Sequence, residues 1–236
     1  MEENLCRMCG SKLLSDMGIV KNFPFFACDE CEFIFSPKID SSEMAKRYKS
    51  GYHGISEGAP SKGWPSSVFI LLEPVFNIAG KNNGFSILDF GAGQSILPEA
   101  LRKLGNDVTE IDVAPIKNPH PSRITGDITK LKLSPEIFDI TYSFQVFEHL
   151  AEPGLVLNEL LRLTKPGGFI LIHTDMETPE RAEGFENWWY VLPPDHCSFY
   201  RHRTFELFVQ KSADFIPYKE PKAVLIQKNT NKQNFA

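Results

Sequence analysis

The sequence has no long run of lysine and arginine, and no apolar run long enough to span a bilayer. Its 25 basic residues are outnumbered by 30 acidic ones, so the formal net charge is -5 at pH 7. A basic surface that would hold a phosphate backbone or an anionic membrane is therefore not expected. The first ten residues, MEENLCRMCG, lack the apolar segment of a secretory signal. We expect a cytoplasmic protein with neither a nucleic acid nor a membrane as its partner.

Cysteine is scarce, but four of the five cysteines form two Cys-x-x-Cys pairs. Because cytoplasmic thiols stay reduced, such pairs are judged first as metal ligands. Two intervening residues let both thiolates of a pair turn toward one ion, and two pairs supply a tetrahedral zinc site. Disulfides and a rubredoxin-like iron centre are the alternatives. The predicted zinc ligands are Cys6, Cys9, Cys28 and Cys31.

These cysteines define a predicted zinc-binding module, similar to a zinc ribbon, over residues 1–40. A segment this short cannot bury a core of its own, so the metal is expected to supply folding energy. Acidic residues outnumber basic ones within it. This favours a structural or substrate-facing role over the reading of a nucleic acid.

Residues 41–84 are predicted to form a helical lid or linker. A glycine-rich loop up to residue 63 contains Tyr52 and His53, which we assign as candidates to cover a bound acceptor. An exposed loop histidine is more often only solvated. The helix expected over residues 65–79 has a dense apolar face and is most simply a helix that packs on the core.

Residues 87–95, ILDFGAGQS, read as a buried strand, a glycine turn and the start of a helix. The strand ends at Asp89, and the turn contains Gly91 and Gly93. Glycines there let the backbone approach a ligand and leave N–H groups available at the helix start. Sharp turns without any ligand use the same residues, so the pattern alone leaves both interpretations open.

Further strands are expected at residues 106–111, 122–125 and 138–143, and then over FILIHT. A helix is expected at about residues 153–164, whereas three prolines in APIKNPHPS disfavour one after Asp112. Residues 215–218 and 222–227 suit closing antiparallel strands, and 229–236 form a polar tail. The prediction is an α/β domain over residues 85–228 with a doubly wound, mostly parallel, seven-stranded sheet, whose ligands bind at the carboxyl ends of the strands.

Five segments in order, ILDFGAGQS, VTEIDV, GDITKL, FDITYSFQVFEHL and LLRLTKPGGFILI, resemble the successive motifs of class I S-adenosylmethionine-dependent methyltransferases. The resemblance implies a Rossmann-like fold and S-adenosylmethionine as cofactor. The implied cofactor-binding residues are Asp89, Gly91, Gly93, Asp112, Asp127, Ile128 and Phe144. This chain departs from the family at Ser95, where a third glycine is common. A nicotinamide-dinucleotide site is the main rival, but Ile96 stands where that fingerprint needs glycine or alanine.

Glu148 and His149 follow the fourth predicted strand and resemble part of a Glu-x-x-Glu-His element of quinone-type O-methyltransferases, which can bind a divalent ion. Gln145 replaces its first glutamate. His149 is a candidate general base, because imidazole titrates near neutrality; the alternative is a hydrogen-bonded pair, Glu148 with His149, at a helix start. His196 lies in a run similar to the Pro-x-His segment of bacterial small-molecule methyltransferases and is the second candidate base.

The segment of residues 175–195 is long for a loop, and loops of this length are usually functional or mobile. Trp188 and Trp189 are candidates for a wall against the acceptor, and the alternative is that the loop's aromatics pack on the zinc module. The function expected is methyl transfer to a small-molecule acceptor, favouring oxygen and a saccharide or related metabolite, with zinc as a structural ion. An RNA methyltransferase with a zinc module and a noncatalytic binding module are the two alternatives.

Overall fold

The computed structural model describes residues 5–37, 42, 46, 64–178, 184–216, 218 and 221–230. The predicted loop residues Tyr52 and His53 lie outside the described residues, as do residues 231–236 of the predicted tail. Within the part of the chain that is described, no helix has both the length and the apolar character that crossing a bilayer requires.

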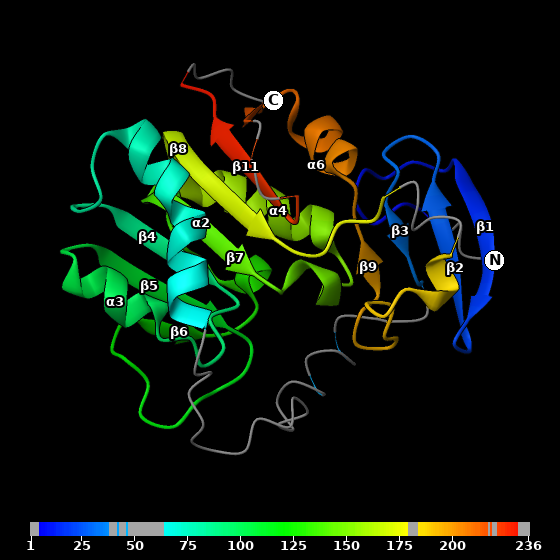
Figure 1. The fold of residues 1–236 in the computed structure, drawn as a ribbon, viewed down its shortest axis with the longest axis horizontal. Coiled ribbons are helices and arrows are strands. Elements are labelled where there is room, and N and C mark those ends of the chain that lie inside the picture. The colour runs from blue at the N-terminus through cyan, green and yellow to red at the C-terminus, as the bar shows by residue number, and fades with distance from the viewer. Residues whose placement is uncertain are drawn as a thin grey trace.

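A seven-stranded sheet forms the centre of the main domain, in the order β10-β11-β8-β7-β4-β5-β6 (Figure 1). Strands β6, β5, β4, β7 and β8 pair in parallel, whereas β11 runs antiparallel to both β8 and β10. The predicted doubly wound, mostly parallel sheet is thereby confirmed. The strands are β4 (Ser86–Phe90), β5 (Asp107–Asp112), β6 (Arg123–Thr125), β7 (Phe138–Phe144), β8 (Thr164–His173), β10 (Ala213–Ile216) and β11 (Ala223–Lys228).

Helices cover both faces of this sheet, because successive side chains of each strand enter opposite cores. Ile87 and Leu171 belong to the core under two of the helices, α2 and α3. Their neighbours Leu88 and Ile170 belong to the core under the other two, α4 and α6. The helices are α2 (Trp64–Ala79), α3 (Leu97–Lys103), α4 (Pro153–Leu163) and α6 (His202–Val209).

The link between β5 and β6 and the start of β8 each follow from local proline and glycine residues. The proline-rich link between β5 and β6 contains no helix, as predicted. Strand β8 begins earlier than predicted, since Phe138 pairs with Thr164 and the next pair is Ile140 with Phe169. The four residues between them, KPGG, therefore form an irregular stretch inside the strand. Gly168 is needed there, because a Cβ would lie 2.8 Å from the backbone oxygen of Asp139.

A second, antiparallel sheet has the order β1-β2-β3-β9 and stands at the carboxyl ends of the parallel strands (Figure 1). Three strands come from the cysteine-containing segment: β1 (Leu14–Val20), β2 (Phe23–Cys28) and β3 (Ile34–Phe35). The fourth, β9 (Ser198–Phe199), comes from the far end of the chain and pairs with β3. The sequence does not indicate this pairing, which covers the edge that β3 would otherwise expose.

Leu160→Ala should lower the free energy of unfolding by about 2–5 kcal/mol, because the side chain is fully buried between α4 and the sheet. The matched control is Leu155→Ala on the same helix, where the leucine is 59% exposed. Urea denaturation monitored by circular dichroism measures both. Equal losses in the two variants would contradict the placement of α4.

Candidate functional site

The glycine turn follows β4 and has two residues with positive φ, Gly91 at 76° and Gly93 at 52°. A Cβ added to Gly91 would overlap the side chain of Val146, in the segment after β7. A Cβ added to Gly93 would meet no described atom within 4 Å. The turn is therefore closely packed on one side and open at Gly93, where its backbone is accessible to a ligand.

Asp112, at the end of β5, fastens this turn to the neighbouring strand. Its Oδ2 accepts a hydrogen bond from the Gly93 N–H at 2.7 Å, and its Oδ1 accepts one from the Ala114 N–H at 2.7 Å. The Arg123 guanidinium donates to the Gly93 carbonyl at 2.9 Å and to Glu110 Oε2 at 3.1 Å. The carboxylate of Asp112 is thus held at the carboxyl edge of the sheet, beside the open backbone of the turn.

The buried carboxyl of Asp89 lies at the same edge and is only 3% exposed. Burial raises its pKa to about 8, and the charges of Glu110 and Asp112 act in the same direction. A positively charged group bound nearby would lower the pKa again and stabilise the carboxylate.

The remaining residues assigned to the cofactor by resemblance lie at neighbouring strand ends. Asp127 caps the short helix η1 (Ile128–Lys130), accepting hydrogen bonds from the Thr129 N–H at 3.0 Å and its hydroxyl at 2.7 Å. Ile128 is 2% exposed and packs in the core under α4. Phe144 is half-buried at the end of β7, with its ring 5.2 Å from that of Tyr142.

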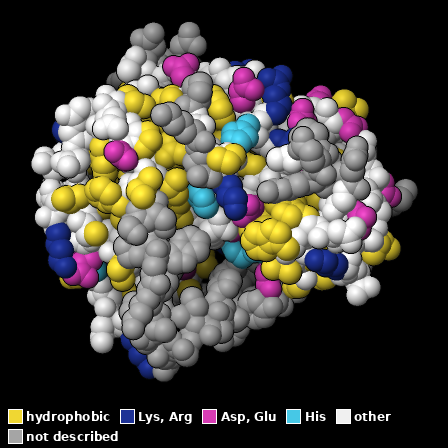
Figure 2. Space-filling view, in the orientation of Figure 1, with side chains coloured by type: hydrophobic (Ala, Val, Ile, Leu, Met, Phe, Trp, Pro, Cys, Tyr) yellow, Lys and Arg dark blue, Asp and Glu magenta, His cyan; other side chains and the backbone are white. Residues whose placement is uncertain are grey.

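Glu148, His149 and His196 form a second cluster, in which one donor atom from each residue lies within 4.8 Å of the others. Glu148 and His149 belong to the short helix η2 (Phe147–His149), directly after Val146, which packs on Gly91. His149 Nε2 is 3.8 Å from Glu148 Oε1, and the two imidazole rings are 4.7 Å apart. Figure 2 shows histidine side chains at the surface between the larger and the smaller lobe of the molecule. The structure therefore brings together all three residues predicted as catalytic.

Backbone carbonyls orient both imidazoles. His149 Nδ1 is 2.9 Å from the carbonyl oxygen of Asp195, and His196 Nδ1 is 2.6 Å from that of Tyr190. Because a carbonyl only accepts hydrogen bonds, each Nδ1 must hold the proton. In the neutral rings, Nε2 is then the atom with the lone pair. Each neutral ring therefore carries its lone pair on Nε2.

Tyr190, which the sequence interpretation did not assign to the site, belongs to a polar network beside Glu148. Its buried hydroxyl donates to Gln145 Oε1 at 3.0 Å and lies 3.1 Å from the hydroxyl of Thr174. Thr174 in turn donates to Glu148 Oε2 at 2.8 Å. Gln145 is thus held by Tyr190, and its Nε2 lies 3.0 Å from His173 Nδ1. No sequence pattern marks this network, because its members come from three separate segments.

Burial shifts the titration of two groups in the cluster. It raises the pKa of the Glu148 carboxyl, and the hydrogen bond from Thr174 opposes this only in part. Burial also lowers the pKa of His196, and the neighbouring His149 adds to that effect. His196 is therefore neutral over a wider pH range than an exposed histidine, as a general base requires.

The two tryptophans of the long loop have different surroundings. Trp188 is 6% exposed and packs among Phe185, Tyr190 and Phe199, in the cluster that includes Phe25 of the N-terminal sheet. This corresponds to the alternative interpretation, in which the aromatics of the loop pack on the cysteine module. Trp189 is 64% exposed and remains available to a ligand.

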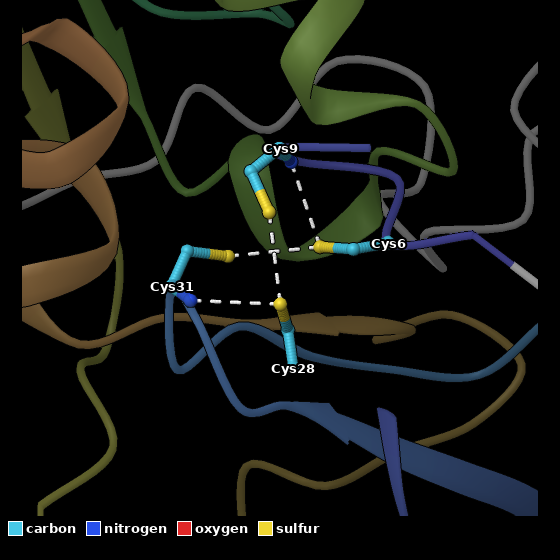
Figure 3. Close-up of side chains that lie close together, drawn as sticks. All are labelled: Cys6, Cys9, Cys28 and Cys31. Atoms are coloured by element: carbon cyan, nitrogen blue, oxygen red, sulfur yellow. Dashed lines mark hydrogen bonds between the residues drawn. The ribbon is translucent and has the colours of Figure 1, made fainter. Parts of the chain in front are cut away.

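The four predicted metal ligands converge on one point (Figure 3). Cys6 and Cys31 Sγ are 3.6 Å apart, as are Cys9 and Cys28 Sγ. A tetrahedron with zinc–sulfur bonds of about 2.3 Å has sulfur–sulfur edges of about 3.8 Å, so the spacing fits. The hydrogen bond between Cys6 and Cys31 lowers the pKa of Cys6 and raises that of Cys31, and burial raises the pKa of Cys9. The remaining cysteine, Cys197, is buried and outside the cluster.

Residues 42–215 match the family model described as a methyltransferase domain, and this chain belongs to that family. Among curated relatives, the ubiquinone biosynthesis O-methyltransferase of Bordetella avium is 30% identical over 124 residues, covering 47% of this chain and 51% of the relative. The malonyl-[acyl-carrier protein] O-methyltransferase of Yersinia pestis is 28% identical over 141 residues, covering 52% and 53%. The chain thus spans about half the length of the curated relatives it matches.

Solved structures of methyltransferases share the fold. The Burkholderia thailandensis 1,6-didemethyltoxoflavin-N1-methyltransferase, with bound 1,6-didemethyltoxoflavin and S-adenosylhomocysteine, aligns with a TM-score of 0.54 at 12% identity, covering 85% of this chain and 97% of that one. The magnesium protoporphyrin IX methyltransferase of Synechocystis PCC 6803, with bound SAH, aligns with a TM-score of 0.56 at 12% identity, covering 80% and 98%. At such identities the likeness establishes the Rossmann-like methyltransferase fold.

Proposed function

We propose that this protein transfers a methyl group from S-adenosylmethionine to a hydroxyl group of a small-molecule acceptor. The observation that carries the proposal is the close placement of two sites at one sheet edge. The open glycine turn is fastened to Asp112, and Val146, which packs on Gly91, leads directly into the cluster with His149. One site suits a nucleoside, and the other suits the removal of a proton.

The residues at the first site fit S-adenosylmethionine by their chemistry. The accessible backbone at Gly93 allows close approach, and the carboxylate of Asp112 can accept hydrogen bonds from ribose hydroxyls. The raised pKa of Asp89 leaves its carboxyl mainly neutral near pH 7, and a bound sulfonium or ammonium group would shift it toward the carboxylate. Asp127 and Ile128 are assigned to the adenine by the family resemblance. When bound, S-adenosylmethionine supplies an electrophilic methyl group on a sulfonium.

The chain's own contribution to the reaction is orientation and proton removal. Either His149 or His196 would accept the proton of the acceptor hydroxyl at Nε2 as the methyl group is transferred to its oxygen. The carbonyls of Asp195 and Tyr190 keep Nε2 in the basic state. Glu148, buried beside both rings, stabilises the imidazolium that results.

Oxygen is the acceptor atom we favour, since the curated relatives above are named O-methyltransferases. The acceptor we propose is a saccharide or a related polar metabolite. The exposed indole of Trp189 on the loop that carries His196 offers a stacking surface for a sugar ring. The net charge of -5 gives no support to an RNA acceptor.

We also propose that the four cysteines hold a structural Zn²⁺. The sulfur spacing supports this assignment, and so do the hydrogen bonds from the Cys9 N–H to Cys6 Sγ and from the Cys31 N–H to Cys28 Sγ, both at 3.5 Å. All four ligand positions are filled by protein, as in structural rather than catalytic zinc sites. The extent of the module, residues 1–40, remains our proposal.

Asp112→Ala should weaken the binding of S-adenosylmethionine at least about tenfold, because charge-assisted hydrogen bonds are worth about 1.5–3 kcal/mol each. Isothermal titration calorimetry measures the affinity. Asp107→Ala, at the exposed opposite end of the same strand, is the matched control and should bind normally. Unchanged affinity in the Asp112 variant would remove the ribose assignment.

Replacing the general base should reduce kcat by about 10²–10⁴-fold without changing cofactor affinity. His149→Ala and His196→Ala identify which imidazole it is, and His202→Ala on α6 is the control. If His196 is the base, its lowered pKa places the midpoint of the acid limb of the rate profile below 6.5, the ordinary value for histidine. Full activity in both variants would exclude histidine catalysis.

Purified protein should contain one zinc ion per chain, measured by plasma mass spectrometry. The double variant with Cys6→Ser and Cys9→Ser should lose the ion and melt at least about 5 °C lower, because metal binding contributes to folding. Cys197→Ser, in a buried cysteine outside the cluster, should keep full zinc. Retention of zinc by the double variant would rule out this site.

A further inference from the structure

The N-terminal sheet is attached to the main domain at the segments that carry the histidine cluster. The Ser36 N–H donates to the Cys197 carbonyl at 3.0 Å, and β3 then pairs with β9. His196 is therefore followed at once by residues that belong to the sheet of the cysteine module. In Figure 1 this sheet, with β9 at its edge, lies at the carboxyl ends of β7 and β8.

The loop that precedes His196 is fastened to the module at two further points. Lys21, in the turn between β1 and β2, donates to the Val191 carbonyl at 2.6 Å. The ring of Phe25 on β2 packs edge-on against Phe185 at 5.3 Å and Phe199 at 5.9 Å. Tyr190, whose carbonyl orients His196, is buried in the same cluster.

The first Cys-x-x-Cys turn also contacts the segment after His149. Arg7 donates to the Ala151 carbonyl at 3.4 Å, and the Gly154 N–H donates to the Arg7 carbonyl at 3.2 Å. A Cβ on Gly154 would overlap the Met8 carbonyl oxygen, so this turn lies directly on the start of α4. Both histidines are thus a few residues from a contact with the module.

Hydrogen bonds also join the segment that contains His149 to the segment that contains His196. The Cys197 N–H donates to the Glu148 carbonyl at 2.9 Å, and the Ser198 hydroxyl donates to the Leu150 carbonyl at 2.6 Å. By contrast, no hydrogen bond or ion pair among the described residues joins the segment of residues 5–37 to the glycine turn or to Asp112. The cysteine module therefore supports the segments of the histidine cluster and not the glycine turn.

We propose that the cysteine module is a positioning element for the acceptor side of the site. By holding β9 and the start of α4 together, it sets the distance between His149 and His196 and keeps both rings in the tautomer with the lone pair on Nε2. Methyl transfer depends on its docking, whereas cofactor binding does not. This inference rests on the proposed function only for the assignment of the histidines as bases.

Gly154→Ala tests the inference without touching a cysteine or a residue of the site. The matched control is Gly184→Ala, where a Cβ meets no described atom within 4 Å and φ is -135°. The full-length variants are compared by zinc content, cofactor affinity, kcat and the ¹⁵N chemical shifts of the imidazoles, which distinguish the two tautomers. Lys21→Met, which removes the bond to Val191 at the surface, serves as a second variant should Gly154→Ala fold poorly.

We expect Gly154→Ala to retain zinc and to bind S-adenosylmethionine within twofold of the wild type. Its kcat should fall at least tenfold, and the shifts of His149 and His196 should move toward a mixture of tautomers. Unaltered shifts and an unaltered kcat in both variants would overturn the inference. Wild-type protein that binds no cofactor would instead defeat the proposed function, and the imidazole shifts would still decide the positioning role.

Discussion

The proposed cofactor site, at the glycine turn and Asp112, depends on the interactions of the buried guanidinium of Arg123. Its side chain is 1% exposed and pairs with Glu110, which also accepts from Arg102 at 2.8 Å. Removing one member of such a buried group leaves an uncompensated charge, at a cost of about 3–5 kcal/mol. Because the same guanidinium holds the Gly93 carbonyl, the stability of the sheet edge and the shape of the glycine turn are linked.

The proposed acceptor site, at the cluster of Glu148, His149 and His196, is built from loops rather than from strands. Tyr190, Thr174 and Gln145 form a polar network beside Glu148, and two backbone carbonyls orient the imidazoles. Loops can be held this accurately only when other elements brace them. The module of residues 5–37 provides such a brace through β3. The two sides therefore rely on separate supports, although Val146 brings them into contact at Gly91.

Features encoded by local patterns could be predicted from the sequence. Short apolar runs that alternate with helical segments predicted the sheet, prolines disfavoured a helix after Asp112, and the spacing of the cysteines predicted their cluster. What could not be predicted depends on contacts between distant segments. The pairing of β3 with β9 involves two residues on each side, and Tyr190 joins its partners only in three dimensions. Trp188 shows the same limit, because the sequence alone allowed both a wall against the acceptor and packing on the module.

A crystal structure with S-adenosylhomocysteine is the most direct test of the central claim, that the carboxyl edge of the sheet holds the cofactor with its sulfur facing the histidine cluster. The account predicts ribose hydroxyls on Asp112, backbone contacts at Gly93, and the sulfur on the side of His149 and His196. A ligand bound elsewhere, or one whose sulfur faces away from both imidazoles, would contradict it.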